Sequence, residues 1–386
     1  MLEDRASVQK VPICVDGRLS ATAATGVAYY ASAMREGLAA TGPAPLVLDD
    51  DRRGRFGGAV PRREAARRYL RARFGGAVSL RVAGQRLYAA DVFRLAQARF
   101  AATGRLLMLE APRPAGIMHW TYPIPAAVRG WVNLYTIHDV IPLVTPALSP
   151  VKAEPLASRI MAIAAVADRF VSVSEAARQE ILDTLPLEPA KVTDCGAAVA
   201  NLTAGSGALP AGLMAGGYFL FCGLDEPRKN LPALIAAWRA SGTAMPLVLA
   251  GPDHAAAVGV PGLVSLPYQD RRALVDLIRQ ARALLFPSLA EGFGLPVAEA
   301  MALGTPVLTA NRGALAETAG GAALLVDPED VAAIAQAIVR LDREADLRAR
   351  LIARGLRRAE AFTPAAFGQR LRRLHDEFAG DSRFAD

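Results

Sequence analysis

Cysteine, lysine and long apolar runs are scarce in this chain of 386 residues. Its three cysteines are far apart and form no metal-spaced pair, so we expect neither a disulfide framework nor a zinc site, and we infer a reducing, cytoplasmic setting. No stretch approaches ~18 uninterrupted apolar residues, the rough minimum for a membrane-spanning helix. Residues 1–5 are acidic where a signal peptide would be basic, so we expect no export. The sequence predicts a soluble protein that at most lies on a membrane.

The composition predicts a globular protein with two domains. Hydrophobic residues make up 52% of the chain, and the 33 glycines and 26 prolines show no period, which excludes a disordered chain and a collagen-like fibre. A chain of 386 residues is too long for one ordinary core. A stretch rich in Gly, Ala and small polar residues, 201–217, predicts a linker between domains 1–205 and 206–386. The final helices could pack back on the first domain.

Apolar runs that end in Gly, Asp or Pro alternate with longer helical patterns, which favours an α/β architecture with parallel sheets. Two such domains leave a cleft between them, and parallel sheets bind ligands at the carboxyl ends of their strands. The main expected strands are residues 11–15, 46–48, 106–109, 133–137, 169–173, 218–222, 246–250, 263–265, 283–286, 306–308 and 323–326. The main expected helices are residues 28–40, 231–240, 271–281, 296–303, 328–341, 347–361 and 364–378.

All the excess positive charge lies in the first domain. Residues 1–205 hold 25 Lys+Arg against 18 Asp+Glu, whereas residues 206–386 hold 19 of each. The surface that carries this excess charge either is simply solvated or contacts an anionic membrane, an acidic or phosphorylated acceptor, or nucleic acid. Few large apolar residues accompany it, which favours contact through charge over deep insertion. Nine arginines fall within residues 51–74, among them Arg62, Arg63, Arg67, Arg68 and Arg71.

The most informative segment carries two glutamates, Glu291 and Glu299, around a glycine-containing loop that leads into a helix near Pro296. A helix N-terminus presents unpaired N–H groups and a positive dipole end, so we expect a diphosphate to bind here. Because carboxylates repel phosphate, Glu291 and Glu299 are better suited to hydroxyl groups attached to the diphosphate. Alternatively, Glu299 only offsets the helix dipole, an effect worth about 0.3–1 kcal/mol.

A second polar cluster, residues 223–230, also lies between a strand and a helix. Lys229 is one of only four lysines beside 40 arginines, which indicates a need for a compact point charge in this turn. Arg228 adds a planar fork that suits phosphate. An exposed basic turn without function is the alternative. Asn230 is expected to cap the following helix.

Candidate residues of the first domain also lie at the ends of strands. His138 ends an apolar strand and faces the expected cleft. Gly26 opens a helix after the first strand, where a missing side chain lets the backbone approach a phosphate closely. Ser174 is expected to cap a helix. Structural roles are expected for the other histidines, His119, His254 and His375.

Together these residues resemble a known enzyme family. Glu291 and Glu299 are separated by seven residues, and residues 226–230, 137–139 and 173–175 accompany them. This pattern is similar to that of the retaining glycosyltransferases of family four, which have the GT-B architecture of two facing Rossmann-like domains.

The resemblance covers residues 11–341, densely in the second domain and weakly over residues 52–104. It implies that the second domain binds a nucleotide-sugar and the first domain binds the acceptor. Many family members carry Arg where this chain has Leu224. The resemblance therefore implies that Arg228 and Lys229 carry the charge of the diphosphate alone.

The family pattern implies a role for each matching residue. Glu299 would bind the ribose, His138 would lie near the reactive face of the transferred sugar, and Gly26 would lie beside the phosphates. Glu291 would act as a positioning and electrostatic residue, because the family implies front-face attack in which the departing phosphate oxygen takes the acceptor proton. Cations and helix-end amides stabilise such a leaving group, so neither a metal nor a cofactor is expected. The backbone that would also hold the sugar belongs to Phe293, Gly294 and Leu295.

The donor and the acceptor are inferred from weaker signals. Residues 138–143 resemble those of bacterial polysaccharide mannosyltransferases, which implies GDP-mannose, with UDP-hexoses and GDP-fucose as alternatives. Contacts to the base are expected near Pro267 and Tyr268. The acceptor is expected to be a glycan, free or linked to polyprenyl diphosphate, in cell-surface polysaccharide synthesis at the inner face of the plasma membrane.

Two other functions are open from the residues alone. Asp49, Asp50 and Asp51 end a strand and could hold Mn²⁺ or Mg²⁺ in a single-domain, metal-dependent transferase, although a plain polar strand end is the simpler interpretation. A non-catalytic protein that binds nucleic acid or membrane would use residues 51–74. That run lacks the interleaved aromatics of single-strand binders and leaves the second domain unexplained, so we expect no nucleic-acid partner.

Overall fold

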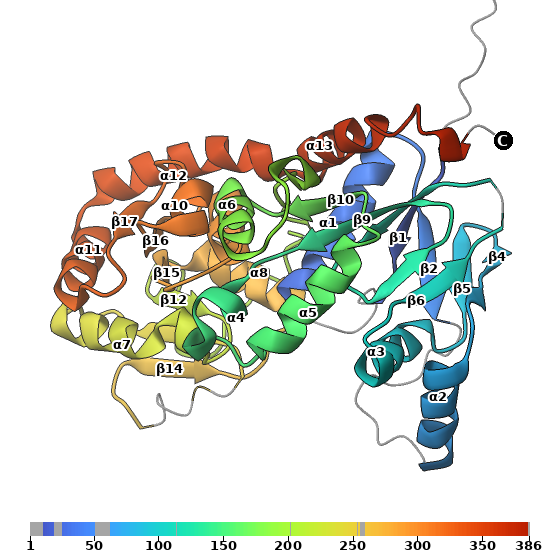
Figure 1. Ribbon diagram of the computed structural model, residues 1–386. Coiled ribbons are helices and arrows are strands. Elements are labelled where there is room, and N and C mark those ends of the chain that lie inside the picture. The colour runs from blue at the N-terminus through green and yellow to red at the C-terminus, as the bar shows by residue number, and fades with distance from the viewer. Residues whose placement is uncertain are drawn as a thin grey trace, which may run out of the picture.

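The computed structural model describes residues 11–18, 25–50, 62–112, 114–200, 202–252, 254 and 259–384, without the side chains of residues 62–66. Within these ranges the strands form two large sheets and one small sheet, and the large sheets belong to different halves of the chain. Figure 1 shows the two halves next to each other, with the C-terminal helices running along both. The expected α/β architecture is confirmed.

The first half contains an eight-stranded sheet among the described residues, in the order β11-β10-β9-β7-β1-β2-β5-β4. Neighbouring strands are parallel except β4 and β5, which are antiparallel at one edge. The strands are β1 (Ile13–Asp16), β2 (Leu46–Asp50), β4 (Arg81–Ala83), β5 (Arg86–Ala89), β7 (Ile117–Trp120), β9 (Val132–Ile137), β10 (Arg169–Ser172) and β11 (Val192–Asp194). The expected strand 106–109 belongs instead to a separate small sheet of β3 (Val78–Ser79), β6 (Leu107–Glu110) and β8 (Ala126–Val128).

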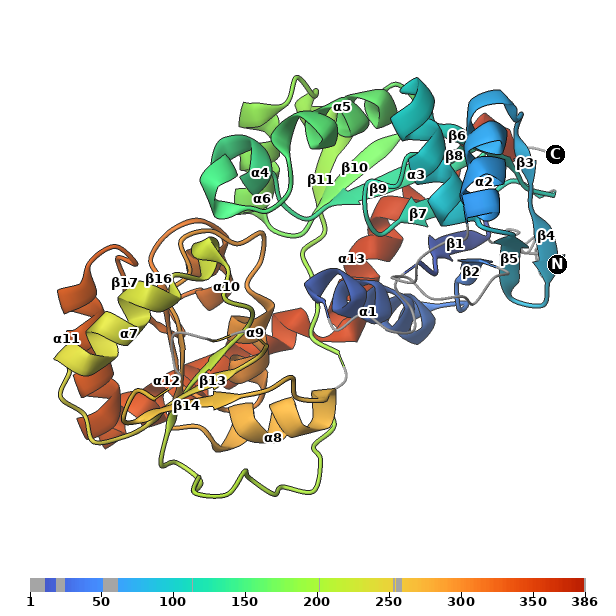
Figure 2. The ribbon, with the colours of Figure 1, turned by 90° about the horizontal axis from the view of Figure 1, so that it is seen from below.

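Helices cover both faces of the first sheet. Figure 2 shows α5 on one face and α1 on the opposite face. In α1, Tyr30, Met34 and Leu38 recur every four residues and are buried, as expected for an amphipathic helix packed on a sheet. The helices of this half are α1 (Gly26–Thr41), α2 (Arg62–Phe74), α3 (Val92–Thr103), α4 (Ile141–Val144), α5 (Ala153–Ala164) and α6 (Glu175–Thr184).

The second half contains a six-stranded parallel sheet among the described residues, in the order β14-β13-β12-β15-β16-β17. Its central strands are continuous buried runs, as strands of a parallel sheet covered on both faces must be. The strands are β12 (Phe219–Cys222), β13 (Leu247–Ala250), β14 (Leu263–Leu266), β15 (Ala283–Phe286), β16 (Val307–Ala310) and β17 (Leu324–Val326).

Helices also cover both faces of the second sheet. One group is α7 with α11, and the other is α9 with α8 and α12; Figure 1 shows α7 and α12 on opposite sides of the sheet. Pro296 lies in the first turn of α9, as its sequence context predicted. The helices are α7 (Leu231–Ala240), α8 (Arg271–Gln280), α9 (Leu295–Ala302), α10 (Gly313–Ala319), α11 (Val331–Arg343), α12 (Ala345–Ala359) and α13 (Pro364–Asp376).

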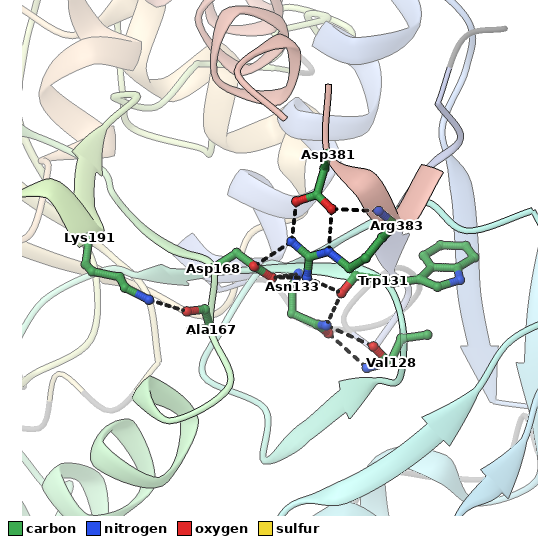
Figure 3. Close-up of polar contacts among 8 residues, drawn as sticks. All are labelled: Val128, Trp131, Asn133, Ala167, Asp168, Lys191, Asp381 and Arg383. Atoms are coloured by element: carbon green, nitrogen blue, oxygen red, sulfur yellow. Dashed lines mark hydrogen bonds and ion pairs between the residues drawn. The ribbon is translucent and has the colours of Figure 1, made fainter. Parts of the chain in front are cut away.

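The C-terminal segment returns to the first half. Helix α13 packs on α1, where Gly37 and Gly368 lie so close that a Cβ on either would overlap the opposite backbone. Beyond α13, Arg383 donates to Asp168 (2.7 Å) and to Asp381 (2.6 Å), as Figure 3 shows. These contacts fasten the end of the chain to the first half, whereas the exact boundary between the two domains stays a prediction.

No helix in the described part of the chain is both long enough and apolar enough to cross a bilayer.

Candidate functional site

A cavity of about 580 Å³ lies between the two halves. Loops that follow β7 and β9 in the first half and β12, β13 and β15 in the second half line it. The carboxyl ends of strands from both sheets therefore meet at one place. β12 and β15 are neighbours at the point where the strand order of the second sheet reverses, which is where open α/β sheets bind their ligands.

Three residues predicted from the sequence form one charged cluster in this cavity. Glu291 Oε2 accepts from Arg228 (2.6 Å), and Glu291 Oε1 accepts from Lys229 Nζ (2.6 Å). Arg228 also pairs with Glu226 (2.7 Å), and the Lys229 ammonium lies 4.4 Å from the centre of the Phe286 ring. The two cations expected to bind a diphosphate thus share the carboxylate expected to contact the sugar.

The charges within this cluster determine its protonation. Burial alone would raise the pKa of Glu291, but the positive charges of Lys229 and Arg228 outweigh burial and hold that pKa below its ordinary value. Burial lowers the pKa of Lys229, and the charge of Glu291 opposes that change. The three residues therefore form a network of two cations and one anion, and the carboxylate of Glu226 beside Arg228 offsets the remaining positive charge.

Glu299 has a partner that the sequence did not reveal. Its Oε1 accepts from Arg271 at the start of α8 (2.8 Å), and both side chains are mostly buried, at 6% and 16% exposure. The Arg271 guanidinium also lies over the ring of Tyr29 from α1, 4.6 Å from its centre. All three residues line the cavity, so Glu299 is held at the cavity wall by a cation rather than by the helix end alone.

His138 lines the cavity. Its burial and its hydrogen bond determine its protonation state. Its Nε2 donates to the carbonyl oxygen of Thr121 (2.8 Å), and its ring meets the Tyr30 ring edge to face at 4.7 Å. Burial lowers the pKa of His138 to about 4. The imidazole is therefore neutral at pH 7, and its Nδ1 keeps a lone pair that can accept a hydrogen bond.

The loop before α9 reaches the cavity with its backbone. Phe293, Gly294 and Leu295 all line the cavity, and Gly294 adopts the left-handed conformation (φ 96°) that favours glycine. Thr318 donates to the carbonyl oxygen of Phe293 (2.6 Å), which fixes the loop. Gly26 lines the cavity from the opposite half, and a Cβ there would lie 3.6 Å from Leu295. The first turn of α9 therefore faces the first turn of α1.

The two halves contact each other directly beside the cavity. Ser174 caps α6 as expected, accepting from Ala177 N, and it also donates to the carbonyl oxygen of Gly292 (2.7 Å). The carboxylate of Glu317 in α10 accepts from the backbone N–H groups of Glu175 (3.0 Å) and Ala176 (2.8 Å). A side chain of the second half therefore satisfies the N-terminus of a helix in the first half.

Comparison with known proteins agrees with this architecture. The family model described as glycosyl transferases group 1 matches residues 215–358. Sucrose-phosphate synthase from Thermosynechococcus elongatus superposes with a TM-score of 0.68 at 19% identity, over 97% of this chain and 100% of that one. Anabaena Alr3699/HepE in complex with UDP and glucose superposes with a TM-score of 0.63 at 14% identity, over 95% of this chain and 100% of that one. The protein has the GT-B fold.

Sequence similarity is confined to part of the chain. O-antigen chain mannosyltransferase B of Escherichia coli is 35% identical over 161 residues, which are 38% of this chain and 42% of that relative. The match thus spans less than half of either protein. Together with the group 1 description, it supports a glycosyltransferase built on the GT-B fold.

Of the two residues expected to contact the base of the donor, one lines the cavity and the other does not. Tyr268 lines the cavity of the GT-B structure and is 59% exposed, so its ring is available at the rim. Pro267 is not among the lining residues, and its carbonyl oxygen accepts from Gln269 (2.8 Å). Asn230 holds the N-cap position of α7 as expected, but its side chain makes no capping bond, because its amide donates to the carbonyl oxygens of Pro287 (3.1 Å) and Pro328 (2.6 Å) instead.

The acidic strand end has partners of its own. Asp49 pairs with Arg86 (3.1 Å), and Asp50 accepts from the backbone N–H of Asp91 (2.7 Å), while Asp51 lies outside the described residues. The described ranges contain no group of three or more His, Cys, Asp or Glu that could hold a metal ion. A single-domain transferase is wrong for this chain, because the GT-B fold has two facing domains.

The basic run forms helix α2 in part. Arg67 and Arg71 are exposed beside the exposed apolar residues Tyr69, Leu70 and Phe74. In contrast, Arg68 is half-buried and paired with Asp91 at the start of α3, so it joins two helices and does not extend into solvent. The side chains of Arg62 and Arg63 lie outside the described residues.

Several residues in the cavity of the GT-B fold, or in the contacts beside it, were not predicted from the sequence. Arg271 had a usable signal, because it follows the helix cap Asp270 at the junction between a strand and a helix, and Arg228 also lies between a strand and a helix. Tyr29 and Tyr30 had none, since aromatic residues near the start of a helix are common. Glu317 also had none, because its partners lie 142 residues away in the sequence.

Proposed function

We propose that this GT-B protein transfers a hexose from a nucleotide-sugar to a glycan acceptor, with retention of stereochemistry. The observation that carries the proposal is the cluster of Arg228, Lys229 and Glu291 at the carboxyl ends of β12 and β15, facing the first turn of α9. Two cationic side chains beside a helix N-terminus suit a diphosphate. The group 1 family description and the mannosyltransferase relative support the same activity.

The reaction needs stabilisation of the departing diphosphate more than it needs a nucleophile. As the bond between sugar and phosphate breaks, negative charge grows on the phosphate oxygens, and Arg228, Lys229 and the amides before α9 are already in position to bind it. The acceptor hydroxyl attacks on the same face and its proton passes to the departing phosphate oxygen. Glu291 is paired with both cations, so its role is to hold them and to contact the sugar.

His138 acts through its neutral form. Because Nε2–H is donated to Thr121, only Nδ1 is available to accept a hydrogen bond from a sugar hydroxyl. Glu299 accepts hydrogen bonds from the ribose diol in the same cavity. Neither residue transfers a proton in this scheme, so the rate depends on positioning and charge.

The donor proposed first is GDP-mannose. The name of the Escherichia coli relative favours mannose, whereas the Anabaena neighbour was solved with UDP and glucose. Thermal shift with GDP, UDP and their sugar conjugates tests the choice, because at equal concentration the ligand that binds the folded protein more tightly stabilises it more. A larger shift with UDP than with GDP would reject GDP-mannose.

Retention and independence from metal are tested on the product. NMR of the anomeric proton of the transferred sugar in the product should show the same configuration as in the donor. Transfer should continue in excess EDTA, because cations of the protein bind the diphosphate. Loss of activity in EDTA with recovery on adding Mn²⁺ or Mg²⁺ would contradict this part of the proposal.

The acceptor side includes helix α2. Its exposed Arg67 and Arg71 beside Tyr69, Leu70 and Phe74 suit the interface of an anionic bilayer that presents a lipid-linked glycan at the inner face of the membrane. Binding to anionic liposomes should fall as salt rises and should be weak with neutral liposomes. Equal binding to both kinds of vesicle would leave these arginines as a solvated surface.

A further inference from the structure

One guanidinium joins three parts of the chain at the edge of the cavity. Arg271 donates to Glu299 Oε1 (2.8 Å) and to the carbonyl oxygen of Ala200 (3.1 Å), and its Cζ lies 4.6 Å from the centre of the Tyr29 ring. Glu299 belongs to α9 of the second half, Tyr29 belongs to α1 of the first half, and Ala200 lies where the first half ends.

The pair of Arg271 and Glu299 is held away from water. With side chains 16% and 6% exposed, loss of either partner would leave the other charge buried without compensation. The guanidinium donates to Glu299 while its Cζ lies over the Tyr29 ring, and its extended fork suits this pair of contacts better than a compact ammonium group would. The contact with Tyr29 exists only when the two halves lie as they do here.

We infer that Arg271 and Tyr29 are positioning residues of the donor site. Arg271 orients the Glu299 carboxylate toward the hydroxyl groups of the donor, and the Tyr29 ring ties this oriented pair to the first half when the halves close on the donor. The inference rests on the proposed function, in which Glu299 contacts the ribose. A plain structural ion pair would stabilise the fold but would not connect closure to turnover.

Substitutions at Tyr29 separate closure from binding. Tyr29→Phe keeps the ring and is the conservative variant, so it should retain most of the kcat that Tyr29→Leu loses. In Tyr29→Leu the ring is lost, so kcat should fall at least about tenfold. The dissociation constant for GDP or UDP, whichever stabilises the wild type more, should stay within about twofold, because the nucleotide binds to the second half.

Substitutions at Arg271 test the orientation of Glu299. In Arg271→Lys the charge stays but the flat fork is lost, so KM for the donor should rise about tenfold while the melting temperature changes little. Arg271→Met should raise KM further. The matched control is Arg272→Lys on the exposed side of the same helix, which should leave KM and kcat unchanged.

Two results would overturn the inference. One is a kcat of Tyr29→Leu equal to that of Tyr29→Phe, and the other is a donor KM of Arg271→Lys equal to that of Arg272→Lys in folded protein. Failure of the proposed function looks different, because wild-type protein would then neither bind a nucleotide nor transfer a sugar.

Discussion

Replacing Glu291 with Gln should destabilise the empty protein while preserving its affinity for a diphosphate. The substitution keeps the size of the side chain and removes one negative charge. That charge is shared by Arg228 and Lys229, each 2.6 Å from a different carboxylate oxygen. Without it, both cations lose the carboxylate that they share, and Arg228 keeps its pair with Glu226.

The size of the effect follows from the burial of the cluster. The side chains of Glu291 and Lys229 are only 11% and 9% exposed, so water screens their charges poorly. Breaking a buried ion pair by removing one partner costs about 3–5 kcal/mol. Since Gln retains one acceptor oxygen and the cavity admits some water, we expect a loss of about 3 kcal/mol in the free energy of unfolding.

Nucleotide should recover much of this loss. In the wild type, a diphosphate competes with the Glu291 carboxylate for Arg228 and Lys229, whereas in Glu291→Gln the cations are available to it. GDP or UDP should therefore bind the variant at least as tightly as the wild type and raise its melting temperature by more. Transfer should still fall by at least about a hundredfold, because the sugar loses a charged contact.

Urea unfolding at pH 7 with and without nucleotide, together with calorimetric titration, measures these quantities. The pH matters because the pKa of Glu291 lies below its ordinary value of 4.5, so its contribution to stability is complete above about pH 4.5 and is lost at lower pH. Glu226→Gln is the matched control, since Glu226 pairs with one of the two cations and is more exposed (23%) than Glu291 (11%), so its loss should cost clearly less. Wild-type stability in Glu291→Gln, or nucleotide affinity reduced more than about tenfold, would refute the reasoning.

Three further results are expected. Glu317→Ala should lower the free energy of unfolding by about 1–2 kcal/mol in urea titrations, because the N–H groups of Glu175 and Ala176 lose their acceptor while Ser174 still caps α6; an unchanged midpoint would show that this contact adds no stability. Gly292→Ala should reduce kcat with little change in nucleotide affinity, because its Cβ would overlap the carbonyl oxygen of His138 between the halves; normal turnover would contradict the observed closeness. His119→Gln should weaken the pH dependence of stability: burial holds the pKa of His119 near 3, so only the unfolded chain takes up this proton as the pH falls below 6.5, at a cost of about 1.4 kcal/mol per pH unit. Measuring the free energy of unfolding at pH 7 and pH 5 tests this. An equal change in variant and wild type would exclude His119 as a source of the pH dependence.

The second half was predictable because its strands are short and fully buried. The runs Phe219–Cys222 and Ala283–Phe286 are apolar throughout and are bounded by polar or turn residues, so their positions were predicted to within a residue. Because Glu291 and the basic turn at Arg228 and Lys229 both follow predicted strands, the sequence also predicted that they lie at the same edge of the sheet. Which charges would pair was not predictable, because pairing depends on the distance between two loops.

The first half was harder to predict for a physical reason. Strands β4 and β5 meet in an antiparallel hairpin around Gly84, whose positive φ of 57° permits a tight turn, but their arginines hide the apolar alternation. Strand β7 was also missed, because its buried run, Ile117–Trp120, includes His119 and lies close to prolines. Short strands of this kind gain stability from their neighbours and have little pattern of their own.

The buried histidines show what kind of role the sequence could predict. His119 and His375 were expected to be structural, and their rings do form a buried contact of 3.2 Å between β7 and α13. The sequence could not predict that His119 also contacts Thr136 (3.1 Å), whose hydroxyl contacts Tyr30 (3.2 Å) beside the cavity. A polar chain from the C-terminal helix to the site thus consists of residues that are individually unremarkable in the sequence.

The path of the chain restricts how the two halves can move. The segment that leaves the first half and the segment that returns to it lie together, because Val199 N donates to the carbonyl oxygen of Phe362 (2.8 Å). Phe362 also packs on Phe293 at 5.3 Å, and Phe293 lines the cavity. The segments at Val199 and Phe362 both pass beside the loop before α9. Rotation about these two segments would therefore open the cavity while disturbing this loop little. Such a rotation must break the contacts of Ser174 with Gly292, of Glu317 with the start of α6, and of Arg271 with the Tyr29 ring. Their loss should therefore affect turnover more than nucleotide binding.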